Sequence, residues 1–157
     1  MKISKPLLAV AGLLSFSVAL FQLAITFSPE VGLYFGISEN VASNARNLQA
    51  TGTVTAVTFA MFGVYALSGA GVVAPMPLLR FGLLGIGIAH VVRGLTAIPI
   101  LLVRIGYLQS FGSVPNSEPA TSLVSLGIGI VYLAGTISGW RSLPKTAKPQ
   151  PDNQRSS

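Results

Sequence analysis

Two residues that can do chemistry stand one helical turn apart in an apolar stretch of this sequence, His90 and Arg93. An imidazole can accept or donate a hydrogen bond, and a guanidinium binds carboxylates and other anions. At a spacing of three residues, both side chains lie on neighbouring parts of one helix face. The pair therefore indicates either a site for an anionic ligand or a buried ion pair that fixes helix packing.

The composition of the chain is that of a membrane protein. Its 157 residues suffice for one domain, and only 9% of them are charged while 51% are hydrophobic. A soluble domain carries about 25% charged residues, so lipid must cover part of this apolar surface. The sequence has no cysteine, which excludes disulfides and thiolate metal sites. We expect neither a metal nor a cofactor.

Four stretches are long enough to cross a bilayer, whose core needs roughly 20 apolar residues of helix. They are residues 7–27, 51–73, 78–103 and 120–140, and only the third contains charged side chains. The first is longer than the apolar part of a signal peptide, so we expect it to be retained. We predict an all-α fold, a four-transmembrane-helix bundle over residues 1–141, and a disordered basic cytoplasmic tail over residues 142–157.

The basic residues near the helix ends predict the orientation of the bundle. Seven lie on one predicted side, namely Lys2, Lys5, Arg80, Arg141, Lys145, Lys148 and Arg155, against Arg46 and Arg104 on the other. The side richer in lysine and arginine stays in the cytoplasm, so both termini are predicted to be inside. This placement at helix ends also argues against nucleic acid as the partner of a chain with a net charge of +6.

The outer connection between the first two helices, residues 28–50, is predicted to form an interfacial flap. Residues 31–37 are apolar and aromatic but too few to span a membrane, and Ser38 is placed to cap a short helix that runs through Asn47. An unstructured loop is the alternative. Residues 105–119, which are rich in Gly, Ser and Pro, are expected to be irregular.

An arginine at the predicted depth of Arg93 costs around 2.5–3.5 kcal/mol to insert, so it should face protein, water or an anion. Polar side chains of the other helices reach a similar depth and predict a polar cavity in the outer half of the membrane. The candidate ligand-binding residues are Arg93, His90, Gln22, Thr55, Thr58, Ser125 and Glu30.

Arg93 has two candidate charge partners near the helix ends, Glu30 and Glu118. Glu30 is favoured, because the flap could fold it over Arg93. If that pair is structural, His90 is expected to be a satisfied donor in the core. A third possibility is that Arg93 reaches along the lipid-facing surface to the interface.

Proline and glycine positions add two predictions about the third and fourth helices. Pro99 removes a donor from the helix ladder and is expected to bend the third helix near the site. Gly135 and Gly139 of the fourth helix stand at the GxxxG spacing that permits close helix approach. We favour packing within one bundle, with homodimer formation as the alternative.

Three segments carry a resemblance to a known family: Pro29-Glu30 after the first helix, residues 44–52 at the end of the flap, and residues 90–95 on the third helix. Over residues 5–140 this layout resembles the small four-helix bacterial membrane proteins of the DoxX-like kind. The resemblance implies a four-helix bundle in the bacterial plasma (inner) membrane. Some relatives are linked to quinone-dependent sulfur oxidation, but no redox residue maps onto this chain, so that activity is not carried over.

Three classes of function remain open. The favoured one is an accessory or small-molecule-binding membrane protein that holds a small anionic or quinone-like ligand in the cavity around Arg93. The second is a small transporter or channel, against which stand the lack of a membrane-embedded carboxylate and the one-sided charge distribution. The third is a membrane enzyme acting on a lipid or quinone with His90 as acid or base. No cysteine or nearby carboxylate would assist His90, so we lean away from an enzyme.

Overall fold

The computed structural model of the chain describes residues 3–35, 37, 39–107 and 118–143. Within these residues the fold is entirely helical. The helices are α1 (Ser4–Thr26), α2 (Pro29–Tyr34), α3 (Glu39–Ala42), α4 (Ala45–Ala70), α5 (Leu79–Leu95), α6 (Ala97–Arg104) and α7 (Glu118–Gly139). Four segments are long and apolar enough to cross a membrane: α1, α4, α7 and the stretch Leu79–Arg104 that contains α5 and α6. The predicted four-helix membrane bundle is confirmed. Most of the predicted tail, residues 144–157, lies outside the described residues.

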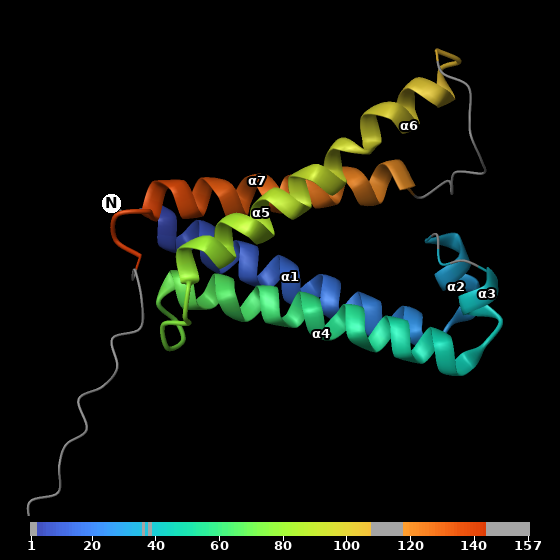
Figure 1. The fold of residues 1–157 in the computed structure, drawn as a ribbon, viewed down its shortest axis with the longest axis horizontal. Coiled ribbons are helices and arrows are strands. Elements are labelled where there is room, and N and C mark those ends of the chain that lie inside the picture. The colour runs from blue at the N-terminus through green and yellow to red at the C-terminus, as the bar shows by residue number, and fades with distance from the viewer. Residues whose placement is uncertain (1–2, 36, 38, 108–117, 144–157) are drawn as a thin grey trace, which may run out of the picture.

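The four spans are arranged as two antiparallel helix pairs. Helix α1 packs along α4 and α5 packs along α7, while α1 and α7 join the two pairs. Figure 1 shows the pairs close together at the end where the N-terminus lies, and apart at the end that carries α2 and α3. We call residues 29–42 the flap and this end of the bundle the flap end. The two helix pairs therefore diverge toward the flap end.

The opposite half of the bundle is tightly packed around Tyr132, which has no exposed surface. Its hydroxyl donates a hydrogen bond to the Phe62 carbonyl of α4 over 2.8 Å, and Ser15 of α1 lies 2.8 Å from the same hydroxyl. Because the single phenolic hydrogen goes to the carbonyl, Ser15 must be the donor in the second bond. Leu8 and Leu83, also without exposed surface, continue this core toward the termini. The hydroxyl of Tyr132, a residue of α7, thereby joins α7 to α1 and α4 through two hydrogen bonds inside the membrane.

Three glycines of α7 allow close approach to other helices of the same chain. A β-carbon at Gly135 would lie 2.9 Å from Leu8 of α1, one at Gly139 would lie 2.9 Å from Ser4 of α1, and one at Gly129 would lie 2.8 Å from Val91 of α5. Real β-carbons do not come this close, so none of these sites accepts a side chain without movement. The prediction that α7 glycines pack within the bundle is confirmed at these three positions, whereas Gly127 faces open space.

The second span begins at Ala45 rather than at the predicted residue 51, and the predicted helix of residues 38–47 is divided between α3 and the start of α4. Ser38, the predicted cap, lies outside the described residues. Helix α4 begins at Ala45, and the chain turns before it at Asn44. The Asn44 side chain accepts hydrogen bonds from the backbone N–H groups of Arg46 and Asn47, at 3.0 and 3.3 Å. An asparagine cap of this kind satisfies two donors that a helix start leaves unpaired, which fixes the boundary here. The flap itself is a structured segment with two short helices, α2 and α3.

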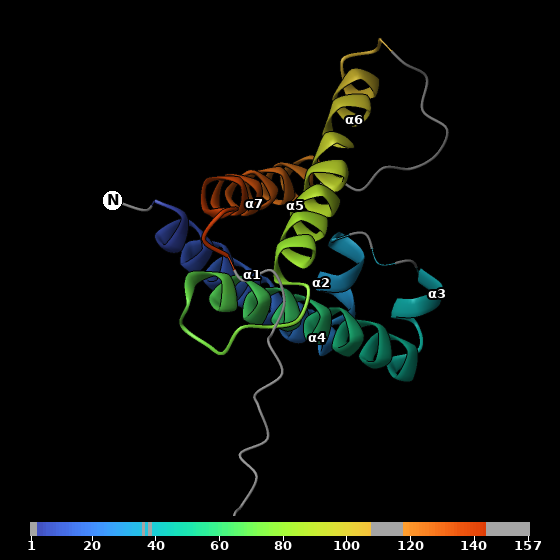
Figure 2. The ribbon, with the colours of Figure 1, turned by 60° about the vertical axis from the view of Figure 1, so that its left-hand side comes forward.

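The third span is interrupted, as the position of Pro99 predicts. Helix α5 ends at Leu95 and α6 begins at Ala97, with Thr96 between them. The Thr96 hydroxyl donates to the Arg93 carbonyl over 2.6 Å and lies 3.1 Å from the Ser122 hydroxyl of α7. Beyond this break α6 leads away from the rest of the bundle (Figure 2). The break therefore ends the close packing of the third span just after Arg93.

Candidate ligand-binding cavity

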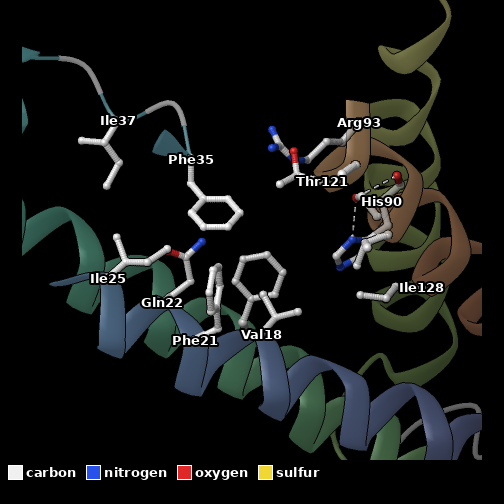
Figure 3. A pocket seen from close by; sticks show the side chains of 14 residues that line it. Val18, Phe21, Gln22, Ile25, Phe35, Ile37, His90, Arg93, Thr121 and Ile128 are labelled. Atoms are coloured by element: carbon white, nitrogen blue, oxygen red, sulfur yellow. Dashed lines mark hydrogen bonds between the residues drawn. The ribbon is translucent and has the colours of Figure 1, made fainter. Parts of the chain in front are cut away.

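A cavity of about 310 Å³ lies between the two helix pairs toward the flap end. It is lined by fourteen residues from α1, α4, α5, α7 and the flap, of which nine are apolar and five are polar. The volume is at the lower limit of the 300–1,000 Å³ that small-molecule sites occupy. Figure 3 shows side chains of α1 and the flap facing those of α5 and α7 across this space. The sequence predicted a polar cavity, whereas the observed one is mostly apolar. Four of its five polar side chains lie on the wall formed by α5 and α7, and Gln22 of α1 faces them.

His90 lies on that polar wall and is held by α7. Its side chain is only 6% exposed, and its Nδ1 atom lies 3.0 Å from the Ser125 hydroxyl. The same hydroxyl donates to the His90 carbonyl over 3.1 Å, so Ser125 is hydrogen-bonded to both the ring and the backbone of His90. The ring stacks against Tyr132 with a centroid distance of 6.1 Å. The other ring nitrogen, Nε2, is buried and has no hydrogen-bond partner within the described part of the chain.

Arg93 lines the cavity one turn further along α5, at its rim. Its side chain is 54% exposed, and its Nη2 atom lies 3.6 Å from the Glu118 carboxylate. The Thr121 hydroxyl, one turn along α7, lies 3.0 Å from this carboxylate and also 3.0 Å from the Glu118 carbonyl, so the two acceptors share its one hydrogen. The rim therefore carries an arginine and a glutamate side by side, with a hydroxyl that orients the glutamate.

The predicted partner of Arg93, Glu30, does not form this ion pair. The carboxylate within 4 Å of Arg93, among the residues that the structure describes, belongs to Glu118. The reason is the pairing of helices: Glu118 begins α7, which packs along α5, whereas Glu30 sits in α2 beyond the end of α1. Glu30 is exposed and is not part of the cavity wall.

The structure brings four of the seven predicted site residues together. Arg93, His90, Gln22 and Ser125 all line the cavity. The two threonines of α4 and Glu30 are not among its lining residues. The hydroxyl of Thr55 donates to the Thr51 carbonyl and that of Thr58 to the Val54 carbonyl, each over 2.8 Å. Both threonine hydroxyls therefore donate to the backbone of their own helix, as threonine often does in a helix interior.

Sequence reasoning missed the aromatic side of the cavity. Phe21 of α1, Phe59 of α4 and Phe35 of the flap all line it. Phe35 packs edge-on against Phe21 with a centroid distance of 4.9 Å. The only signal for Phe35 was the apolar, aromatic character of the flap, and for the other two there was none, because phenylalanine is unremarkable in a membrane helix. Which phenylalanines face inward depends on helix rotation.

The arrangement suits binding of a molecule that is mainly apolar and has one polar end. Apolar and aromatic side chains surround most of the space, and the polar end of a ligand would meet His90 inside or Arg93 at the rim. Within the described residues, no three His, Asp or Glu side chains are grouped so that they could hold a metal ion.

No protein-family model, curated protein or solved structure matches the chain. The DoxX-like resemblance stays a prediction.

Proposed function

We propose that this protein is a multi-pass membrane protein that binds a small, largely apolar molecule in the cavity between its two helix pairs. The observation that carries the proposal is the composition of the cavity wall. In an otherwise apolar lining, His90 is buried with only one of its two ring nitrogens hydrogen-bonded, and Arg93 pairs with Glu118 at the rim. Small-molecule sites have this character, with a few polar groups that orient the ligand in an apolar pocket.

The packing below the cavity favours binding over passage across the membrane. Leu8, Leu83 and Tyr132 fill the half of the bundle opposite the flap and have no exposed surface. A molecule in the cavity therefore meets a closed core and leaves by the way it entered. This supports the binding protein over the transporter or channel that the sequence left open.

The proposed site lies in the outer half of a bacterial plasma membrane, with the flap facing outward and both termini in the cytoplasm. The argument is the excess of lysine and arginine at the opposite end of the bundle. Large apolar side chains such as Leu13, Leu20 and Ile137 are exposed along the spans, as contact with lipid requires.

Photo-crosslinking with benzophenone, an apolar probe that inserts into nearby C–H bonds on illumination, tests the proposal in the purified protein. We expect adducts on cavity residues of α1 and α7 such as Val18, which is half-buried in the lining. Val18→Trp should fill part of the space and suppress these adducts. Val57→Trp is the matched control, because Val57 is 57% exposed on α4 and does not line the cavity.

Two results decide between binding and simple partition into the surrounding lipid or detergent. Adducts that concentrate at the cavity and disappear in Val18→Trp alone support the proposed site. Adducts spread over the exposed faces of all four spans, and equal in the two variants, would contradict it. Circular dichroism of both variants checks that the helical fold is kept.

A further inference from the structure

The hydrogen bonds around His90 determine which of its ring nitrogens carries the hydrogen. The Ser125 hydroxyl has one hydrogen, and the His90 carbonyl, 3.1 Å away, can only accept it. The contact of 3.0 Å between Ser125 and Nδ1 then needs its hydrogen from the imidazole. In a neutral ring this places the hydrogen on Nδ1 and leaves Nε2 with a lone pair. Nε2 is therefore a hydrogen-bond acceptor.

This acceptor has no donor among the residues that the structure describes. Nε2 is buried and has no partner among the described residues. His90 as a whole is only 6% exposed and lies in a membrane-spanning segment. Tyr132 stacks on the ring at 6.1 Å, but its hydrogen goes to the Phe62 carbonyl. Ser15 donates to Tyr132 in turn. Neither Tyr132 nor Ser15 therefore has a hydrogen left for Nε2, and an unpaired acceptor inside a membrane is unfavourable.

A ligand in the cavity can supply the missing donor after a small movement. His90 lines the cavity, and its unbonded nitrogen is on the side of the ring turned away from Ser125 and toward Val18 of α1 (Figure 3). Nε2 itself has almost no exposed surface, so a neighbouring side chain must rotate to let a ligand atom reach it. The ring centroid of Phe59 lies 5.7 Å from that of His90, and Phe59 is half-buried and also lines the cavity. Rotation of Phe59 could therefore open the way.

We propose that the occupant is a lipid-soluble alcohol or phenol whose hydroxyl donates to Nε2 of His90. This inference rests on the proposed binding function and names the class of ligand. The apolar body of the molecule would lie among Phe21, Phe35 and Phe59, which line the cavity. Ethers, ketones and carboxylates cannot fill the role, because they only accept hydrogen bonds. A cationic amine could donate, but it would lose its hydration among the apolar side chains that form most of the lining, which is unfavourable.

A pair of probes that differ only in the donor tests this class. 4-Hexylphenol and its methyl ether, 4-hexylanisole, share one apolar body, and binding is measured by their competition with benzophenone crosslinking. We expect the phenol to compete roughly three- to tenfold more strongly, which is the effect of one net hydrogen bond. In His90→Phe, which keeps an aromatic ring and removes the acceptor, the two probes should become equal.

The wild-type protein offers a second readout that does not depend on any variant folding. The chain contains a single histidine, so ¹⁵N-labelled histidine gives only two side-chain nitrogen signals. We expect the Nδ1 signal at the position of a protonated nitrogen and the Nε2 signal at that of an unprotonated one. Addition of 4-hexylphenol should move the Nε2 signal in the direction of hydrogen bonding, and 4-hexylanisole should leave it in place.

The outcomes test the proposed ligand class separately from the proposed binding function on which it rests. Failure of both probes to compete at the cavity would overturn the proposed binding function. Equal competition by both probes, with an unresponsive Nε2 signal, would keep the cavity and overturn the hydroxyl donor. A hydrogen on Nε2 in the ligand-free protein would overturn the tautomer and with it this inference.

Discussion

Ser125 shows how one small side chain can set the chemistry of a larger one. It accepts from the ring of His90 and donates to the backbone of the same residue, so it fixes both the rotation and the tautomer of the imidazole. The sequence singled out Ser125 only as a polar residue at the depth of Arg93. Its specific partner follows from the packing of α5 against α7.

We expect Ser125→Ala to destabilise the protein by about 1–3 kcal/mol, because it leaves a buried Nδ1–H without an acceptor. Ser138→Ala is the matched control on the same helix. Its hydroxyl is exposed and donates to carbonyls of its own helix, so its loss should change stability by no more than about 0.5 kcal/mol. Thermal unfolding in a mild detergent measures both, and equal effects would argue against a role of Ser125 in holding His90.

The charge pair at the cavity rim gives a prediction of modest size. Arg93 and Glu118 are 54% and 26% exposed, and such pairs couple by less than about 1 kcal/mol. A double-mutant cycle of Arg93→Ala and Glu118→Ala should show a small favourable coupling in the unfolding free energy. Glu30→Ala is the control and should add to Arg93→Ala without coupling. Coupling of Arg93 to Glu30 instead would contradict the ion pair described here.

At the scale of the helices, hydropathy alone predicted which segments cross the membrane but not where they begin. The N-terminal turn of α4 carries Leu48, which is 2% exposed, so this turn is packed against other parts of the molecule. The Asn44 side chain caps the helix and sets its start at Ala45, whereas the span predicted from hydropathy starts at residue 51. The capping asparagine is present in the sequence, but a prediction from hydropathy alone does not use it.

The charge partner of Arg93 and the aromatic residues of the cavity wall could not be predicted from the sequence for a related reason. Glu30 and Glu118 stand at similar predicted depths, and only the pairing of α5 with α7 selects Glu118. Likewise Thr55 and Thr58 share the predicted depth of Arg93, yet they do not line the cavity. The depth of a side chain in the membrane follows from its position along the helix. The direction in which that side chain points depends on how each helix is rotated against its neighbours.

The glycines of α7 allow a sharp test of helix packing. Gly135→Leu should destabilise the bundle by roughly 1–3 kcal/mol or more, since its side chain would overlap Leu8 of α1. Gly127→Leu is the matched control: it faces open space, and losing a helix glycine should be neutral or favourable. Thermal unfolding together with light scattering measures stability and oligomeric state. A larger effect of Gly127→Leu, with loss of a dimer, would place the important glycine contact between chains.

At the scale of the whole molecule, the predicted orientation can be tested with single cysteines, because the chain has none of its own. Ser43 lies at the flap end and Ser142 at the opposite end, and both are exposed. We expect an impermeant thiol reagent to label Ser43→Cys in intact cells and Ser142→Cys only after lysis. Labelling of Ser142→Cys in intact cells would reverse the proposed orientation.

We propose that the cavity between the two helix pairs is closed at its inner end and holds a small amphipathic molecule. Nuclear Overhauser effects between the ring protons of 4-hexylphenol and methyl groups of the protein, in deuterated detergent, test this most directly. We predict strong effects to Val18 of α1 and Ile128 of α7, which line the cavity, and weak ones to Val57 and Ile137, which are exposed on the outer faces. Effects that are strongest at Val57 and Ile137 would contradict the account.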